Sequence, residues 1–325
     1  MNAAANTSLL SVEDHCVEIP TRRGVLRPVD HVSLTISAGE ILGVVGESGA
    51  GKSMTGNAVI GLLDPPAHIS GGQVLLGGAR IDNLPKDKMR RVRGKRIGMV
   101  FQDPLTSLNP LLPIGDQLIE TIQEHLGLGQ RAARDRAVAA LDEVGIPAAG
   151  SRIDSYPHEF SGGMRQRVVI ALALCAEPDL VIADEPTTAL DVSVQAQIVS
   201  LLKKLCRERG TGVMLVTHDM GVIAEATDRV AVMYAGRLAE IGPTAQVLTD
   251  PRHPYTAGLM GSTPGASLGR RRLHQIPGTM PGLSAVPDGC AYNPRCPRVE
   301  SVCRTEPRPP MAGSAACWFP GEVKI

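Results

Sequence analysis

Short apolar runs alternate with helical patterns through most of the chain. Val29–Ser37 (VDHVSLTIS) alternates apolar and polar positions, which predicts a strand with one solvated face. Ile41–Val45 (ILGVV) is continuously apolar and enters a glycine-rich turn, as a buried parallel strand does. Further apolar runs predict strands at Arg96–Phe101, Leu180–Ala183, Val213–Thr217 and Val230–Met233, and helical patterns separate several of them, for example Gly115–Leu126 and Ser193–Arg209. This alternation predicts an α/β sheet with ligands at the carboxyl ends of its strands.

The pattern changes twice along the chain. From about residue 103 to residue 178, helices and loops follow one another without strands, which predicts an inserted helical subdomain. After about residue 250, Pro, Gly and Arg dominate and the apolar periodicity fades. We therefore expect a first domain over residues 1–250, containing the helical subdomain, and a separate C-terminal extension over residues 251–325.

Composition and charge narrow the possible functions. The chain has 325 residues, of which 43% are hydrophobic, and its 33 basic residues balance 33 acidic ones. Zero net charge and only eight aromatic residues (Trp 1, Tyr 4, Phe 3) argue against a nucleic-acid partner. No secretory signal is visible at the N-terminus, and no apolar run approaches the ~18 residues that span a bilayer. If the protein works at a membrane, we expect it to bind at the membrane surface as a peripheral protein.

A glycine-rich turn follows the run Ile41–Val45. Its residues, Gly46-Glu47-Ser48-Gly49-Ala50-Gly51-Lys52-Ser53, fit the phosphate-binding pattern GxxxxGK[ST]. Glycines let the backbone wrap the phosphates, Lys52 reaches the outer phosphates and the Ser53 hydroxyl ligates Mg²⁺. An ordinary glycine-rich turn is the alternative, and the buried strand before the loop favours a nucleotide site.

Two carboxylates end another apolar strand. Leu180–Ala183 meets Asp184 and Glu185, and buried carboxylates are costly unless a cation or a reaction uses them. Asp184 suits the hydration shell of Mg²⁺, and Glu185 suits a base that orients and deprotonates the attacking water. The alternative is a solvated strand end.

Two further polar residues follow predicted strands. His218 comes directly after Val213–Thr217, which suggests a contact with the γ-phosphate. Gln102 comes directly after Ile97–Phe101 and opens the helical insert, where its amide can touch Mg²⁺ and the attacking water. Either residue alone would carry little weight.

A second glycine-bearing loop lies at Phe160-Ser161-Gly162-Gly163-Met164-Arg165-Gln166-Arg167. Ser161 and the unshielded amides of Gly162 and Gly163 precede a helix-like run, and such a helix start binds anions. Because the chain already has one complete phosphate site, we expect this loop to serve a nucleotide held by another molecule. This arrangement predicts that the functional protein is a complex of two such subunits.

These motifs together resemble the ATP-binding subunits of ABC transporters. The resemblance covers about Ser33 to Val247 and adds Ala189-Leu190-Asp191 as the D-loop to the phosphate loop, Gln102, the FSGGM signature, LVIADE and His218. It implies a P-loop NTPase core with an antiparallel β subdomain, an inserted helical subdomain and a small cysteine-bearing extension. It also implies that two such domains sandwich two ATP molecules, with Ser161, Gly162 and Gly163 acting on the partner's ATP.

The chain departs from the family pattern at two places. Met164 replaces the usual final glutamine of the signature, which removes one polar contact. The aromatic residue that stacks on adenine in the family is expected around residues 21–26, yet TRRGVL contains none. Arg22 or Arg23 could stack a guanidinium on the base instead.

A narrower resemblance concerns the dipeptide/oligopeptide (and nickel) importer subgroup. It rests on FQDPLTSLNP at Phe101–Pro110, HPYT at His253–Thr256 and the cysteine tail GCAYNPRCPRVESVC…ACW. It implies a peripheral ATPase on the cytoplasmic face of the membrane. Its implied partners are a second ATP-binding subunit, identical or homologous, two transmembrane permease subunits and an extracytoplasmic substrate-binding protein.

Four cysteines crowd the last forty residues. The spacing Cys290-x5-Cys296-x6-Cys303-x13-Cys317 differs from the C-x₂₋₄-C pairs of zinc knuckles. Some members of the subgroup hold a [4Fe–4S] cluster at these positions, and Cys₄ ligation is compatible with one. Zinc and reduced thiols remain open alternatives.

Other functions also remain open on the sequence alone. A soluble ABC-type ATPase acting in translation or DNA repair is a different class, although such proteins usually carry two nucleotide domains or a long coiled coil. The cargo could be nickel or glutathione in place of peptides, because the selecting surface would lie on other subunits.

Overall fold

The structure is a computed structural model that describes residues 8–187, 190–262 and 275–321. The chain forms two compact units. Among the described residues, one unit comprises residues 8–9, 37–40, 83–187 and 190–215, and the other comprises residues 10–36, 41–82, 216–262 and 275–321. We call them the insert unit and the loop unit, because the first contains the helical insert and the second contains the phosphate loop. The predicted division at residue 250 stays a prediction.

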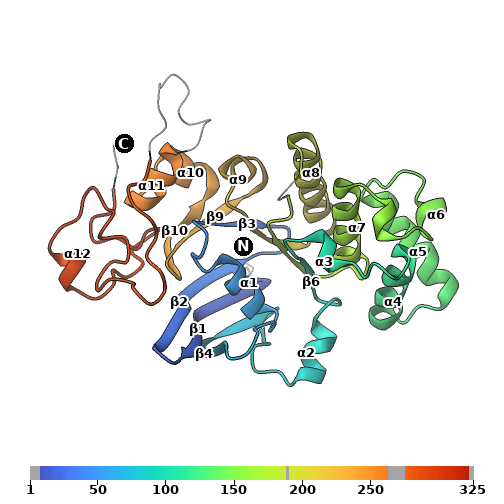
Figure 1. The fold of residues 1–325 in the computed structure, drawn as a ribbon, viewed down its shortest axis with the longest axis horizontal. Helices are drawn as coiled ribbons and strands as arrows, with labels where there is room; N and C mark the ends of the chain where they lie inside the picture. Colours follow the sequence, from blue (N-terminus) through green and yellow to red (C-terminus); the bar gives the residue numbers. More distant parts are fainter. Residues whose placement is uncertain (1–7, 188–189, 263–274, 322–325) are drawn as a thin grey trace, which may run out of the picture. The chain divides into compact units, whose positions relative to one another are not determined.

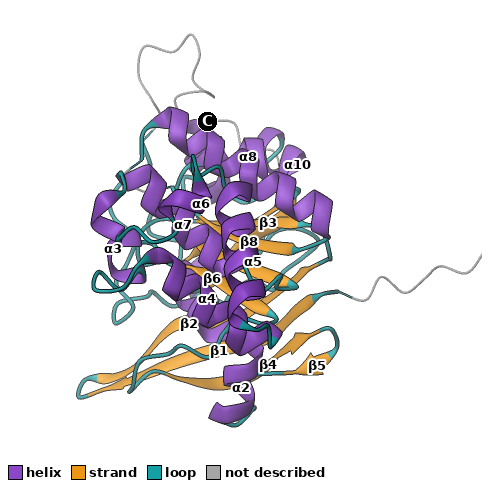
Figure 2. Ribbon diagram, turned by 90° about the vertical axis from the view of Figure 1, so that its right-hand side faces the viewer, coloured by secondary structure: helices purple, strands orange, loops and turns teal. Residues whose placement is uncertain are grey.

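The loop unit begins with a four-stranded antiparallel sheet. Its strands are β1 (Leu10–Thr21), β2 (Gly24–Ile36), β4 (His68–Leu76) and β5 (Ala79–Arg80), in the order β2-β1-β4-β5. Figure 2 shows these strands side by side. Val32, Leu34 and Ile36 point into the core while the residues between them are exposed, which matches the alternation in the sequence.

A second group of strands in the loop unit carries the phosphate loop. β3 (Ile41–Val45) is buried throughout and pairs in parallel with β9 (Arg229–Tyr234), which pairs with antiparallel β10 (Arg237–Pro243). The helices of this unit are α1 (Lys52–Val59), α9 (Met220–Ala226), α10 (Thr244–Thr249), α11 (Pro254–Gly261) and α12 (Val302–Thr305).

The C-terminal extension shares the core of the loop unit. Its last segment runs along β10, where Ile241 N donates to Ser314 O and Ala316 N donates to Ala239 O, both at 2.8 Å. Tyr234 of β9 packs edge-on against Tyr255 and Tyr292, with ring centroids 4.6 and 5.2 Å apart. The extension is rich in proline and glycine, and these tyrosines, from a chain with few aromatic residues, pack it into the buried core of the loop unit.

The insert unit contains the remaining strands. β6 (Ile97–Val100) pairs in parallel with β7 (Leu180–Asp184), and β8 (Gly212–Val216) follows β7 in the sheet order. The sequence predicted these strands from their apolar runs, and their burial explains why the runs are continuous.

Helices make up the rest of the insert unit. They are α2 (Lys86–Val92), α3 (Pro104–Ser107), α4 (Ile114–Leu126), α5 (Gln130–Glu143), α6 (Ala149–Arg152), a 3₁₀ turn at Pro157–Glu159, α7 (Gly162–Leu174) and α8 (Val192–Arg209). Figure 1 shows α4 to α7 gathered in the green part of the ribbon, and α4, α5 and α7 pack against one another. None of the helices in the described part of the chain combines the length and apolar character needed to cross a bilayer.

Candidate nucleotide site

The phosphate loop connects β3 to α1 and packs closely against the backbone of β9 and β2. Gly46 has φ +153°, and a Cβ there would lie 2.2 Å from Met233 O of β9. Gly51 has φ +101°, and a Cβ there would lie 2.2 Å from Pro28 O of β2. Only glycine fits these two positions, because any side chain would strike backbone that the sheets hold in place.

Lys52 closes the loop from its first helical position. Its side chain is buried, and Nζ donates to Gly46 O at 2.8 Å and to Glu47 O at 3.1 Å. On the outer side, Ala50 O accepts from Gly236 N at 2.9 Å. A fixed positive charge therefore lies within the loop at the start of a helix, which is a place where phosphates bind.

Gln102 and Glu185 meet in the insert unit. The strands before them are parallel neighbours, with Val100 opposite Ala183, so both residues leave the sheet at the same edge. Gln102 Nε2 donates to Glu185 Oε2 at 3.0 Å. Asp184 ends β7 with a relative exposure of 7%, while Glu185 is half-buried with φ +47°. This arrangement aims one carboxylate at a glutamine amide and keeps the other within the sheet end.

His218 lies in the loop unit just after β8. Its side chain is exposed, and the residue before it is attached to β3, because Thr217 N donates to Val44 O at 3.1 Å. The neighbouring Asp219 has a structural role: its Oδ1 accepts from Gly221 N at 2.7 Å and caps α9. His218 is thereby fixed between a central strand and a capped helix.

The signature loop forms the start of α7 in the insert unit. Ser161 is the N-cap, and its Oγ accepts from Met164 N at 3.4 Å. Ser161 and Gly162 are exposed, and a Cβ on Gly162 would meet no atom within 4 Å. Gly163 faces Val194, where a Cβ would lie 2.9 Å from Cγ1. The helix start is thus open over Ser161 and Gly162, as a site for a ligand from outside requires.

Of the remaining predicted nucleotide contacts, Asp191, Arg22 and Arg23 are exposed and Ser53 is half-buried. Asp191 occupies the N-cap position of α8, and Ala189 lies outside the described residues. Arg22 and Arg23 form the tip of the β1–β2 hairpin, where Arg23 N donates to Thr21 Oγ1 at 3.2 Å. Ser53 follows Lys52 in the first turn of α1.

The four tail cysteines line one small cavity of about 20 Å³. Cys290 N donates to Cys303 O at 2.9 Å, which joins two of their segments. Burial raises the pKa of the Cys290 thiol to about 11, and the nearby Cys317, Cys296 and Cys303 add to this effect. Burial also raises the pKa values of Cys296 and Cys317. Four thiols converge on one partly buried place, and the raised pKa values of Cys290, Cys296 and Cys317 keep these three protonated at neutral pH unless a metal displaces the protons.

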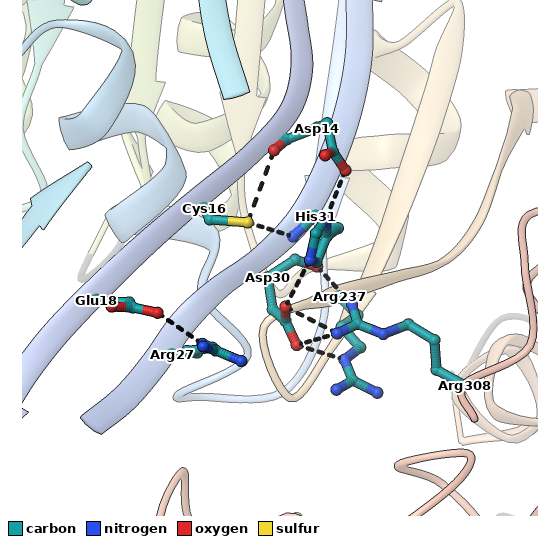
Figure 3. A network of polar contacts seen from close by, with 8 residues as sticks. All are labelled: Asp14, Cys16, Glu18, Arg27, Asp30, His31, Arg237 and Arg308. Atoms are coloured by element: carbon teal, nitrogen blue, oxygen red, sulfur yellow. Dashed lines mark hydrogen bonds and ion pairs between the residues drawn. The ribbon is translucent and has the colours of Figure 1, made fainter. Parts of the chain in front are cut away.

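A different trio has the tightest ligand spacing among the residues that the structure describes. Cys16, Asp30 and His31 offer ligand atoms within 4.8 Å of one another. Figure 3 shows why a cation is disfavoured there: Asp30 already accepts from Arg237 at 2.7 Å and from Arg308 at 2.8 Å. Two guanidinium groups neutralise the carboxylate, so we assign no metal to this trio.

Two residues of the extension touch the phosphate loop, and sequence reasoning missed both. Arg295 Nη1 donates to Glu47 Oε1 at 2.8 Å, and Tyr255 OH accepts from Glu47 N at 3.0 Å. Both residues belong to motifs that mark the importer subgroup, HPYT and the cysteine tail. Their link to the loop spans more than 200 residues of sequence, so no local pattern could have revealed it.

Comparison with known proteins agrees with the motifs. Residues 29–188 match the family profile described as "ABC transporter", and residues 239–303 match "Oligopeptide/dipeptide transporter, C-terminal region". The dipeptide transport ATP-binding protein DppD of Bacillus subtilis is 48% identical over 91% of this chain and 88% of its own length. The oligopeptide transport ATP-binding protein OppD of Haemophilus influenzae is 46% identical over 92% of this chain and 93% of its own.

A solved structure shares the fold. The dimeric post-hydrolysis ATP-binding cassette MJ0796, bound to ADP and Pi, superimposes with a TM-score of 0.65 at 29% identity, over 72% of this chain and 98% of that one. The expected P-loop ABC ATPase fold is confirmed. Phosphate loop, signature, acidic strand end and extension thus occur together in one chain, which belongs to the ATP-binding subunits of the dipeptide and oligopeptide ABC transporters.

Proposed function

We propose that this ATPase powers the import of dipeptides and oligopeptides through an ABC transporter. The observation that carries the proposal is the match of residues 239–303 to the C-terminal region of oligopeptide/dipeptide transporters. Relatives of 46–48% identity over nine-tenths of the chain are named for the same cargo. The assignment of the cargo rests on the relatives, whereas the assignment of ATP binding rests on residues of this chain.

We assign the ATP phosphates to the loop Gly46–Ser53. Its backbone amides and the Lys52 ammonium would hold the phosphates, and Lys52 would also neutralise charge that develops on the outer phosphate during hydrolysis. Mg²⁺, when bound, would offset phosphate charge, with Ser53, Gln102 and Asp184 as the residues around it. Their hydroxyl, amide and carboxylate oxygens are ligands of the type that Mg²⁺ prefers.

We assign hydrolysis to Glu185, supported by its hydrogen bond to Gln102. Glu185 would take a proton from the attacking water, and Gln102 would orient both the carboxylate and the water. His218 would contact the γ-phosphate, and the loss of this contact after hydrolysis would change the conformation of the chain. Asp191 would lie beside the nucleotide near the partner subunit.

We infer that Ser161, Gly162 and Gly163 act on the nucleotide of a second ATP-binding subunit. The support is the open start of α7, where Ser161 and Gly162 are exposed. Two subunits would then form two composite sites, and a single chain would bind ATP but hydrolyse it slowly. Arg22 and Arg23 remain candidates for stacking on the base, because guanidinium groups stack on aromatic rings.

The other proposed partners follow from the transporter. Two permease subunits would form the path through the membrane, and an extracytoplasmic binding protein would select the peptide. This chain would then sit on the cytoplasmic face of the membrane as a peripheral subunit.

We propose further that the tail cysteines hold an inorganic group, with [4Fe–4S] preferred to zinc. The four residues fit such a group, because Cys290, Cys296, Cys303 and Cys317 line one cavity and are free thiols. Among the described residues, no three of them have sulfurs within 4.8 Å of one another. A single zinc ion with Zn–S bonds of about 2.3 Å draws its sulfurs closer than that, whereas four irons spread them apart.

The alternative functions are not favoured. The matching relatives are named as transport ATP-binding proteins, which speaks against a role in translation or DNA repair. They are named for dipeptides and oligopeptides, which speaks against nickel or glutathione as the cargo.

The test is reconstitution of the complete transporter in proteoliposomes, with ATP enclosed on the cytoplasmic side. Uptake of labelled di-, tri- and pentapeptides is expected with the wild-type chain and not with Lys52→Ala. Nickel and glutathione serve as competing cargoes in the same vesicles. ATP-dependent uptake of nickel or glutathione without any peptide would overturn the proposed cargo.

A further inference from the structure

A segment of the C-terminal extension lies over the phosphate loop. We call residues 276–286 the strap; it has the sequence IPGTMPGLSAV. Arg295 holds its start, donating from Nε to Pro277 O at 2.8 Å and from Nη2 to Gly278 O at 3.4 Å. Met280 then reaches the loop, where a Cβ on Gly49 would lie 3.2 Å from Met280 Cε. The strap therefore touches the phosphate site directly.

Beyond Met280 the strap forms one wall of a cavity of about 340 Å³. This volume falls within the roughly 300–1,000 Å³ that small-molecule sites occupy. Leu283 and Val286 come from the strap, and the lining is completed by Val25, Arg27, Asp30, Ala235 and Arg237. All of these residues belong to the loop unit.

The cavity adjoins the phosphate loop through shared backbone. Arg27 precedes Pro28, whose carbonyl lies against Gly51, and Ala235 precedes Gly236, whose N–H is bonded to Ala50 O at 2.9 Å. In a nucleotide only a ribose separates the base from the phosphates. Phosphates in the loop would therefore bring the base close to this cavity.

The walls of the cavity, which combine aliphatic side chains with guanidinium groups, suit a flat aromatic ring. Val25 is 54% exposed and lines the cavity together with Leu283 and Val286. Arg27 contributes a guanidinium that is held in place by Glu18, with Nε 2.8 Å from Oε1 (Figure 3). Guanidinium groups stack on aromatic rings, and aliphatic side chains cover their faces.

We propose that the purine base of ATP binds in this cavity, between Val25 and Arg27 of β2 and Leu283 and Val286 of the strap. The C-terminal extension thereby supplies part of the nucleotide site and takes the place of the missing aromatic residue. This inference rests on the proposed binding of ATP phosphates by the loop. It places the base at Val25 and Arg27, two to five positions further along the chain than Arg22 and Arg23.

The test compares ATP with inorganic tripolyphosphate, which carries phosphates and no base. Calorimetric titration of the full-length chain with Mg²⁺ measures both affinities. In the double variant Leu283→Ala/Val286→Ala we expect the ATP Kd to rise about tenfold, because apolar contact with the base is lost. The tripolyphosphate Kd should stay within about twofold of wild type, since the loop is unchanged.

A variant on the opposite wall of the cavity tests the base site without changing the strap, so its result does not depend on whether the strap variant folds correctly. Val25→Ser alters an exposed position of β2, and we expect it to weaken ATP binding about threefold and tripolyphosphate binding not at all. Ser284→Ala changes an exposed strap residue that does not line the cavity, and it should bind both ligands as wild type does. The double variant Arg22→Ala/Arg23→Ala tests the tip of the β1–β2 hairpin as the other candidate position for the base.

Three results would overturn the base site while leaving the phosphate site intact. The first is an unchanged ATP Kd in Val25→Ser and in the strap variant. The second is a parallel loss of tripolyphosphate binding, which would mean that the strap only supports the loop. The third is a loss of ATP affinity confined to Arg22→Ala/Arg23→Ala. A wild-type chain that binds neither ligand would instead overturn the nucleotide function, and the base site with it.

Discussion

Arg295 and Glu47 form an ion pair with 2.8 Å between Nη1 and Oε1. The arginine lies next to Cys296 in the extension, and the glutamate is the second residue of the phosphate loop. Their side chains are 7% and 29% exposed, so water screens the pair only partly. The cysteine tail and the nucleotide site are therefore one continuous structure, and a change in the tail is expected to reach the loop.

We expect Arg295→Lys to weaken ATP binding several-fold and to lower the melting temperature. Lysine keeps the charge, but its single ammonium cannot replace a guanidinium that donates to Pro277 O, Glu47 Oε1 and Tyr234 OH at once. Loss of this network should reduce stability by about 2 kcal/mol, or about 4–8 °C in a domain of this size. Calorimetry and thermal denaturation measure both effects.

Arg304→Ala is the matched control for Arg295→Lys. Arg304 belongs to the same extension, is exposed, and should tolerate the change within about 0.5 kcal/mol. Equal losses in the two variants would show that the extension responds to any loss of an arginine, and the specific link to Glu47 would then be refuted.

Local patterns in the sequence predicted the central strands and the motifs that follow them. The runs at Ile41–Val45 and Leu180–Ala183 became strands β3 and β7, because buried parallel strands require continuous apolar residues. The motif order likewise predicted the family. Each of these signals is contained in a few neighbouring residues.

Contacts between distant segments could not be predicted in this way. Glu47 meets Tyr255 and Arg295 only because the extension folds back onto β9 and β10, and no spacing in the sequence encodes that return. The same holds for the cavity beside the loop, whose walls come from β2 and the strap. The missing aromatic residue was visible in the sequence, whereas the cavity that we propose in its place was not, because Leu283 and Val286 lie far from β2 along the chain.

Glu185→Gln should abolish most hydrolysis and keep ATP binding. The amide retains a polar contact to Gln102 but cannot accept the proton of the attacking water, so turnover should fall by roughly 10²–10⁴. Phosphate release by the assembled transporter measures turnover, and titration of the isolated chain measures binding. Near-normal turnover would mean that another residue is the base.

Ser161→Arg should leave ATP binding by the same chain unchanged and stop hydrolysis by the assembled pair. The bulky cation fills the open start of α7, where Ser161 Oγ now caps the helix through Met164 N. Mixing the variant with Lys52→Ala chains provides the control. One composite site in each mixed pair then combines an intact phosphate loop with an intact signature, so partial activity should return. Full activity of Ser161→Arg alone would contradict a role in trans.

His15 should make the fold sensitive to mild acid. It is fully buried in β1, and its ring nitrogens have no hydrogen-bond partner among the described residues. Burial lowers the pKa of His15 from 6.5, opposed in part by the charge of Asp82. Below pH 6.5 the unfolded chain therefore binds a proton that the folded chain binds less readily. The free energy of unfolding should decrease as the pH is lowered through this range, by at most about 1.4 kcal/mol per pH unit.

The comparison of His15→Phe with wild type at pH 7.5 and pH 5.5 isolates this effect. The phenylalanine variant cannot take up the proton, so its melting temperature should fall less between the two pH values. Identical pH dependence in the two proteins would show that His15 does not titrate in this range.

Cys296→Ser should remove the inorganic group from the tail and loosen the phosphate loop. Serine is a poor ligand for iron, so anaerobically purified variant should lose most of the iron and acid-labile sulfide that we expect in wild type. Because Arg295 precedes this residue, ATP affinity should fall together with the metal. Cys206→Ser changes a buried thiol outside the tail cavity and should keep both. Wild-type protein that contains zinc and no sulfide would rule out the cluster, and a metal-free variant with unchanged ATP affinity would rule out the coupling.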